Sequence, residues 1–162
     1  MKPLPARAQA GVAVAARWIV GGLYIWMGLS KAVDPVGFLK LVHQYHVTDE
    51  PLLLNLVAAT LPWFEVLCGL LLVLGVAVRG AALISVAMLV PFTVMVLRRA
   101  MELHTGSGLP FCAIKFDCGC GAGEIFICRK LAENALLTFL SAGLIFLRHH
   151  RLALRPVLFG TR

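Results

Sequence analysis

The sequence predicts a single all-α domain over residues 1–162, an integral membrane four-helix bundle with a cysteine-rich loop between helices 3 and 4. Of the 162 residues, 60% are hydrophobic and only 14% are charged, which is too little charge for a water-soluble domain of this length. The apolar residues also gather in four runs, and crossing a hydrocarbon core of about 30 Å takes roughly 20 helical residues. The expected spans are residues 11–33, 52–78, 80–97 and 131–147.

The first apolar run resembles a secretory signal, because Lys2 and Arg7 precede it. It is too long for a signal, Arg17 interrupts it, and three further runs follow, so we interpret it as a membrane span. The formal net charge of +7 would suggest nucleic-acid binding in a soluble protein. Here the basic residues stand at the ends of apolar runs, without a basic face of interleaved aromatic residues. Composition therefore predicts the lipid bilayer as a partner and excludes nucleic acid.

The basic residues also predict the orientation of the chain. The very short turn at Arg79 and the basic tail at residues 148–151 favour the cytoplasmic side, which places both termini there. Residues 34–51 and 98–130 then form two outer loops. In the first of these, Asp34 can cap a helix that has Pro35 at its first position, so we expect a short amphipathic helix on the membrane surface.

Arg17 and Glu65 are the two ionisable residues clearly within the predicted spans. Lys31, near the end of the first span, is assigned to the outer segments, and Glu133 opens the fourth span near the outer surface. An ionisable residue within a span is costly in hydrocarbon and usually faces a partner or a cavity. One interpretation is a buried Arg17–Glu65 pair that lines a cavity for a quinone or a proton path. The other is that Arg17 reaches the inner headgroups and that local hydrogen bonds hold Glu65. Pro62 and Pro91 should kink the second and third spans.

The loop between the third and fourth spans holds Cys112, Cys118, Cys120 and Cys128, four of the five cysteines. A disulfide within Cys118-Gly119-Cys120 would close a very small ring, which departs from relaxed disulfide geometry and is easily reduced. Glycines at 119, 121 and 123 permit the backbone angles that such a ring needs. These features favour a cysteine pair that exchanges electrons. The fifth cysteine, Cys68, is expected to be a small buried apolar residue.

Two other interpretations of the four loop cysteines stay open. They could form an ordinary structural framework, for example Cys112 with Cys128 plus one more disulfide, and sequence alone does not choose among the three possible pairings. They could also bind zinc or copper together with His104. The absence of a C-x-x-C pair speaks against a zinc ribbon, so no metal site is predicted.

Several segments resemble the MauE/DoxX family. The stretch ARWIVGGLYIWMGLSKAVDPVGFLKLVHQY resembles the first span of that family and the amphipathic stretch after it. LPWFEVLCGLLLVLGVAVRGAAL resembles its second span, with a P-x-x-E-x-x-x-G core at Pro62, Glu65 and Gly69. FDCGCGAGE resembles its cysteine loop, and RKLAENALL the start of its last span. The likeness runs from about Arg17 to Leu147.

The resemblance implies a DoxX-like four-helix bundle in the bacterial inner (cytoplasmic) membrane, with a redox-associated role. MauE members are linked to methylamine utilisation, where they are thought to help form disulfides in the small subunit of a periplasmic dehydrogenase. DoxX members are linked to the oxidation of sulfur compounds with electron transfer to quinone. Residue by residue, the resemblance carries a redox role onto Cys118 and Cys120 and a bundle-core role onto Arg17, Pro62 and Glu65. Gly121 departs from the phenylalanine of many relatives, and Cys112 and Cys128 are additions.

Two hypotheses about function follow. In the first, the protein is a thiol:disulfide redox protein that supports disulfide formation or electron transfer to quinone for a periplasmic partner. Cys118 and Cys120 exchange with the partner, Cys112 and Cys128 relay electrons or lock the loop, and a quinone binds near Arg17 and Glu65. In the second, it is a non-catalytic membrane anchor or accessory subunit, and the disulfide-stapled loop docks a partner protein or membrane complex.

Overall fold

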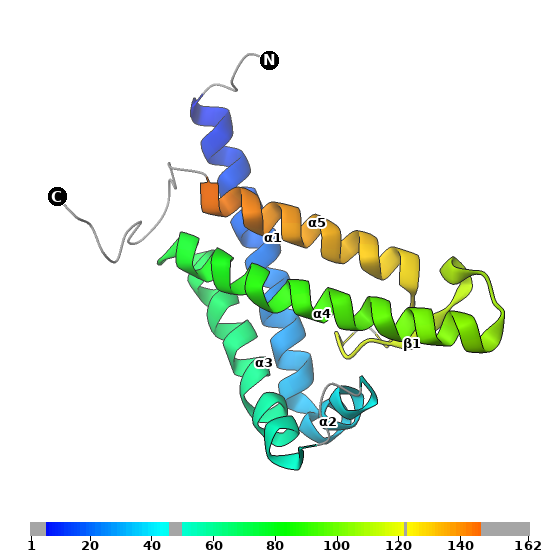
Figure 1. Cartoon of the computed structure of the whole chain (residues 1–162). Coiled ribbons are helices and arrows are strands. Elements are labelled where there is room, and N and C mark those ends of the chain that lie inside the picture. The colour runs from blue at the N-terminus through cyan, green and yellow to red at the C-terminus, as the bar shows by residue number, and fades with distance from the viewer. Residues whose placement is uncertain (1–5, 46–49, 122, 147–162) are drawn as a thin grey trace.

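The computed structural model describes residues 6–45, 50–121 and 123–146, in which helices dominate (Figure 1). The basic tail at 148–151 and residues 46–49 of the first predicted loop lie outside this part of the chain. The elements are the helices α1 (Ala6–Val33), α2 (Pro35–Gln44), α3 (Pro51–Leu74), α4 (Val78–Ser107) and α5 (Ile127–Phe146), a 3-10 turn at Phe111–Ala113, and the strands β1 (Lys115–Asp117) and β2 (Glu124–Phe126).

Three of the described helices are long and apolar enough to cross a membrane: Gly11–Val33, Pro51–Leu74 and Val78–Ser107. Their outward faces carry large apolar side chains, including Trp18, Trp26 and Trp63, each more than half exposed. Such surfaces suit lipid and not water. The fourth long helix, α5, begins with Arg129, Lys130 and Glu133, which lowers its apolar character, so its crossing of the membrane stays a prediction.

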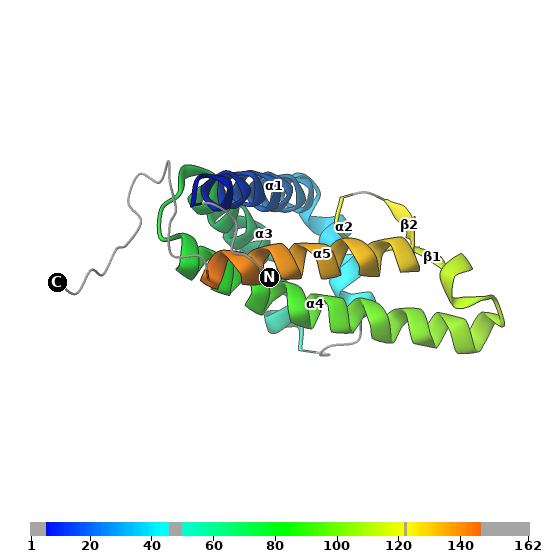
Figure 2. The same ribbon diagram turned by 90° about the horizontal axis from the view of Figure 1, so that it is seen from above.

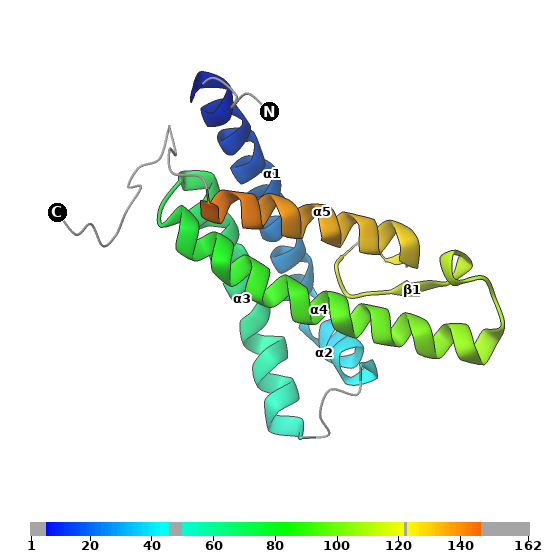
Figure 3. The same cartoon turned by 45° about the horizontal axis from the view of Figure 1, so that its top comes forward.

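The long helices form two antiparallel pairs, α1 with α3 and α4 with α5, that cross each other (Figures 1 and 3). Seen from above, α1 runs along one side of the bundle and α4 along the other (Figure 2). The α1–α3 contact is the closest, because a Cβ atom placed on Gly21 would lie 2.7 Å from the carbonyl oxygen of Gly69, and one placed on Gly28 would lie 2.6 Å from that of Pro62. Small residues at these positions let two membrane helices approach at backbone distance.

Two helices extend beyond the predicted ends of their spans, into the polar sequence on the side of the cysteine loop. α4 continues to Ser107, well past residue 97, and α5 begins at Ile127, ahead of residue 131. The prediction followed hydropathy, which ends at Arg98, whereas the helical hydrogen bonding continues until Gly108 adopts a φ of 66° and ends the helix. The loop between the two helices is therefore only residues 108–126, and we call it the cysteine loop.

The helix predicted after the first span is present as α2. Pro35 stands in its first turn, and a side-chain oxygen of Asp34 accepts a 2.9 Å hydrogen bond from the backbone N–H of Gly37. This N-cap satisfies one of the unpaired donors of the first turn. The predicted cap and proline are thus confirmed.

Candidate redox site at the cysteine loop

The three cysteines of the cysteine loop and Cys128, in the first turn of α5, form two disulfides. Cys112 pairs with Cys128 across a Cα–Cα distance of 5.1 Å, and Cys118 pairs with Cys120 across 5.5 Å. We call these the outer and the inner disulfide. The structure thus contains both the framework pair and the small ring that the sequence left as alternatives. No loop thiolate is left as a soft metal ligand in this state, so the structure gives the metal interpretation no support.

A short hairpin positions the inner disulfide. β1 and β2 are antiparallel with Asp117 opposite Glu124, so residues 118–123 form the connection between the strands. Gly119, Gly121 and Gly123 have φ angles of 73°, 81° and 69°, a region that glycine enters without steric cost. A side-chain oxygen of Asp117 also accepts a 2.8 Å hydrogen bond from the N–H of Gly119. The glycines therefore have the role that the sequence predicted for them.

The inner disulfide is buried and the outer disulfide is accessible. Cys118 is 1% exposed and Cys120 4% exposed, whereas Cys112 is exposed and Cys128 half-buried. The expectation that Cys118 and Cys120 meet a partner directly does not fit this arrangement, because both residues are almost completely buried. The sequence could not show this, since the residues that cover the inner pair come from other elements.

The cover over the inner disulfide comes from α1 and α2. The hydroxyl of Tyr45 donates a 3.1 Å hydrogen bond to the carbonyl oxygen of Cys118. A Cβ atom added to Gly119 would lie 3.3 Å from Leu41, and one added to Gly121 would collide with the side chain of Ser30. The two segments that were predicted to share one face of the membrane therefore meet at one end of the bundle. The Ser30 contact also leaves no room for a phenylalanine at position 121.

Beneath this cover the inner disulfide belongs to an apolar cluster. Cys118 and Cys120 pack in it with buried residues of α4, α5 and the loop: Val96, Ala100, Ile114 and Ile127. Cys128 of the outer disulfide packs against the same cluster. Met27 and Phe92 also pack against it and connect it to the interior of the bundle.

The buried carboxylate of Glu65 pairs with Lys31 and not with Arg17. The ammonium nitrogen of Lys31 lies 2.5 and 2.7 Å from the two carboxylate oxygens, and the two residues are 5% and 7% exposed. Lys31 stands in the last turn of α1, so the sequence interpretation placed it at the membrane surface. Helical side chains lean toward the N-terminus of their own helix, and in an antiparallel pair this brings Lys31 and Glu65 together near the contact of Gly28 with Pro62.

Arg17 is buried as well, but it binds to the opposite end of α3, away from Glu65. It is 1% exposed, and its guanidinium donates hydrogen bonds of 2.9 and 3.1 Å to the carbonyl oxygens of Leu72 and Val73. These carbonyls belong to the last turn of α3, where a cation is favoured by the helix dipole. The interpretation that pairs Arg17 with Glu65 is wrong, because Lys31 holds that carboxylate. The reach of Arg17 to the inner headgroups stays a prediction. The expected core positions of Arg17, Pro62 and Glu65, and of Cys68, are confirmed.

The Lys31–Glu65 pair lines a cavity of about 250 Å³ between α1, α3 and α4. Its walls are mainly apolar and include Met27, Met88, Met95 and Phe92. Met27 and Phe92 are also the residues that touch the cluster of the inner disulfide. The cavity and the inner disulfide therefore lie on two sides of the same pair of side chains.

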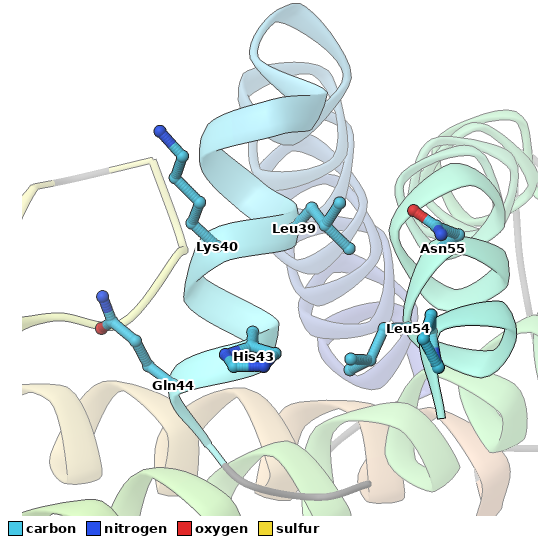
Figure 4. Close-up of a pocket in the computed structure, with 7 residues that line it drawn as sticks. Leu39, Lys40, His43, Gln44, Leu54 and Asn55 are labelled. Carbon is cyan, nitrogen blue, oxygen red and sulfur yellow. The ribbon is translucent and has the colours of Figure 1, made fainter. Parts of the chain in front are cut away.

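A larger groove of about 540 Å³ lies between α2 and the start of α3 (Figure 4). Leu39 points from α2 toward Asn55, and His43 faces Leu54, whereas Lys40 and Gln44 point away from α3 (Figure 4). The lining of this groove includes no cysteine, so it is separate from the redox site.

The pattern of the family described as "Methylamine utilisation protein MauE" matches residues 9–147. No curated protein and no solved structure matches the chain in the same comparisons. The matched region contains the α1–α3 contact, the Lys31–Glu65 pair and both disulfides. The chain, a membrane protein with a disulfide-bonded loop, therefore belongs to the MauE family.

Proposed function

We propose that the protein is a membrane thiol:disulfide redox protein that oxidises thiols of an extracytoplasmic partner and passes the electrons to a lipid-soluble acceptor such as quinone. One observation carries the proposal: two disulfides of opposite exposure share one apolar cluster at the end of a membrane bundle. A single accessible disulfide would be enough to hold the cysteine loop in place. An outer pair together with an inner pair is suited to electron transfer in two steps.

In this proposal the outer disulfide reacts with the partner. A partner thiolate attacks the disulfide of Cys112 and Cys128, and a mixed disulfide forms. The second partner thiol resolves it, so the partner gains a disulfide while Cys112 and Cys128 become thiols. This assigns to the exposed pair the step that the sequence suggested for Cys118 and Cys120.

The inner disulfide then takes over the electrons. A thiolate of the reduced outer pair attacks the disulfide of Cys118 and Cys120, which restores the outer disulfide and leaves two inner thiols. Cys128 packs against the cluster of the inner pair, and this step requires the cysteine loop to move so that the two pairs meet. A two-electron acceptor in the membrane then removes two electrons and two protons and regenerates the inner disulfide.

The test compares two double-serine variants in the full-length protein. Replacing Cys112 and Cys128 should abolish oxidation of a reduced, unfolded substrate protein. Replacing Cys118 and Cys120 should leave one stoichiometric round of exchange at the outer pair and abolish further turnover. If both variants oxidise the substrate as the wild type does, neither disulfide carries the reaction and the proposal is rejected. If the wild type itself does not oxidise the substrate, the alternative role, a non-catalytic anchor whose loop docks a partner, is favoured.

A further inference from the structure

We infer that the cavity between α1, α3 and α4 binds the headgroup of a quinone, with Lys31 as the hydrogen-bond donor to a ring carbonyl. The inference rests on the proposed function and deepens it, because it names the site and the chemical class of the electron acceptor. It replaces the Arg17–Glu65 site expected from the sequence, since Arg17 is used at the far end of α3.

The charge inside the cavity is the first argument. A buried ion pair contributes little net stability, because desolvation offsets most of the attraction, and ionisable groups at membrane depth mostly mark functional sites. Two hydrogen bonds of the Lys31 ammonium go to Glu65, and an ammonium group has three donors. Tyr24, the other polar group of the cavity, already donates to the carbonyl oxygen of Ser85 at 2.7 Å. Lys31 is therefore the group able to donate to a ligand.

A buried ammonium group at the cavity wall is the second argument. Lys31 is 5% exposed and lines the cavity with Glu65. Lys130, 4% exposed, acts electrostatically on both residues, and Glu133 in turn acts on Lys130, so two carboxylates balance the two ammonium groups. The positive charge that faces the cavity is that of Lys31. It favours a ligand with electron-rich oxygens, and more strongly as the ligand takes up electrons.

Size and walls are the third argument. The volume of about 250 Å³ is below the roughly 300–1,000 Å³ of sites that enclose drug-sized ligands, so the cavity suits a single ring whose hydrocarbon tail stays in the lipid. Methionine and aromatic side chains line it, and thioether sulfur makes favourable contacts with flat rings.

Position relative to the inner disulfide is the fourth argument. Oxidation of the two inner thiols releases two electrons and two protons, and a quinone that becomes a hydroquinone takes up both. Met27 and Phe92 touch the cavity on one side and the inner-disulfide cluster on the other. The cavity and the apolar cluster that contains the inner disulfide therefore share Met27 and Phe92 as neighbours.

The test measures binding and not turnover. Purified protein in detergent is dialysed against ubiquinone-1, with empty micelles as the blank. We expect saturable binding to the wild type and to the variant with Cys118→Ser and Cys120→Ser. Leu61→Trp, which fills the cavity, should abolish it, and Leu70→Trp on the outer face of α3 should not change it.

A paired variant tests the role of the charges. Lys31→Gln together with Glu65→Gln removes both charges of the pair at once, and the buried Lys130 keeps the attraction of Glu133, so the fold should be kept. It should bind ubiquinone-1 about tenfold more weakly, as expected for the loss of one charge-assisted hydrogen bond, while Glu102→Gln at the exposed Arg99–Glu102 pair should bind as the wild type does.

Absence of saturable binding, or unchanged binding in Leu61→Trp, would overturn the site. The stoichiometric exchange at the outer disulfide does not need the cavity, so it should persist in Leu61→Trp. If the exchange persists and the binding is absent, only the quinone site is rejected. If ubiquinone-1 binds as expected but the wild type does not exchange disulfides, the proposed function is rejected instead.

Discussion

The hydroxyl of Tyr45 donates a 3.1 Å hydrogen bond to the carbonyl oxygen of Cys118. This contact fastens the end of α2 to the inner disulfide, and the Tyr45 ring lies edge-on to Phe92 at 6.5 Å between centroids. Tyr45 therefore connects three parts of the protein: α2, the cysteine loop and the wall of the cavity.

Tyr45→Phe should loosen the cover over the inner disulfide. It removes the hydrogen bond but keeps the ring contact, and one such bond contributes about 1 kcal/mol, so reduction of the inner disulfide by an added reductant should become about fivefold faster. Mass-spectrometric counting of alkylated thiols over time measures this rate. Thr105→Val, which removes a hydroxyl bonded within α4, is the matched control, and equal rates in all three proteins would contradict the prediction.

The same contact predicts a dependence on pH. Burial raises the pKa of the Tyr45 phenol above its ordinary value of about 10, and the charge of Asp117 raises it further. The folded state favours the neutral phenol, so this contribution to stability is complete below about pH 10 and is lost as the pH rises toward the folded-state pKa. Reduction of the inner disulfide by a phosphine should therefore accelerate above about pH 10 in the wild type. The acceleration should be absent in Tyr45→Phe, and an identical pH profile for the two proteins would refute the link.

Gly21→Ala should destabilise the bundle, whereas Gly22→Ala should not. A Cβ atom at position 21 meets the backbone of α3 at 2.7 Å, and one at position 22 meets nothing within 4 Å. Overpacking of this kind costs about 1–3 kcal/mol, which should appear as a lower thermal midpoint in detergent. Equal midpoints for the two alanine variants would mean that α1 and α3 are less closely packed than described.

Arg17→Met should destabilise the protein without affecting the proposed ligand site. It removes the guanidinium donors of two carbonyls. The carbonyl of Leu72 keeps the N–H of Gly75 at 3.2 Å, whereas the carbonyl of Val73 loses its Arg17 donor. An unsatisfied acceptor in the interior costs about 1–3 kcal/mol. Arg79→Met, at an exposed position, should change the thermal midpoint little. Loss of ubiquinone-1 binding in a folded Arg17→Met protein would contradict the prediction and would mean that Arg17 contributes to the ligand site.

The sequence predicts the apolar helices well because burial in lipid demands long uninterrupted hydrophobic runs. It also predicts α2, because the Asp34 cap and Pro35 are local signals. The partner of Glu65 was missed because it is set by a contact between two helices and not by a local signal. The Lys31–Glu65 contact depends on the register of α1 against α3, and that register is set by the glycines at 21, 28 and 69. Paired positions on two helices are not visible in either helix alone.

In the cysteine loop, too, the sequence predicts the local features but not the contacts with distant segments. Its glycine pattern predicts the small ring at Cys118-Gly119-Cys120, since positive φ angles are a local property. The burial of that ring was not predictable, because Ser30, Leu41 and Tyr45 are far from it in sequence. The extension of α4 to Ser107 was missed because hydropathy reports the lipid boundary and not the end of the helix.

The side chains that cover the inner disulfide would limit the maximal rate at which it can react. Under the proposed function, a sulfur atom that is shielded in this structure can react only after Tyr45, Leu41 and Ser30 have moved away from the loop. Partners with very different thiol chemistry would then be oxidised at the same maximal rate, because uncovering the inner disulfide would limit every turnover.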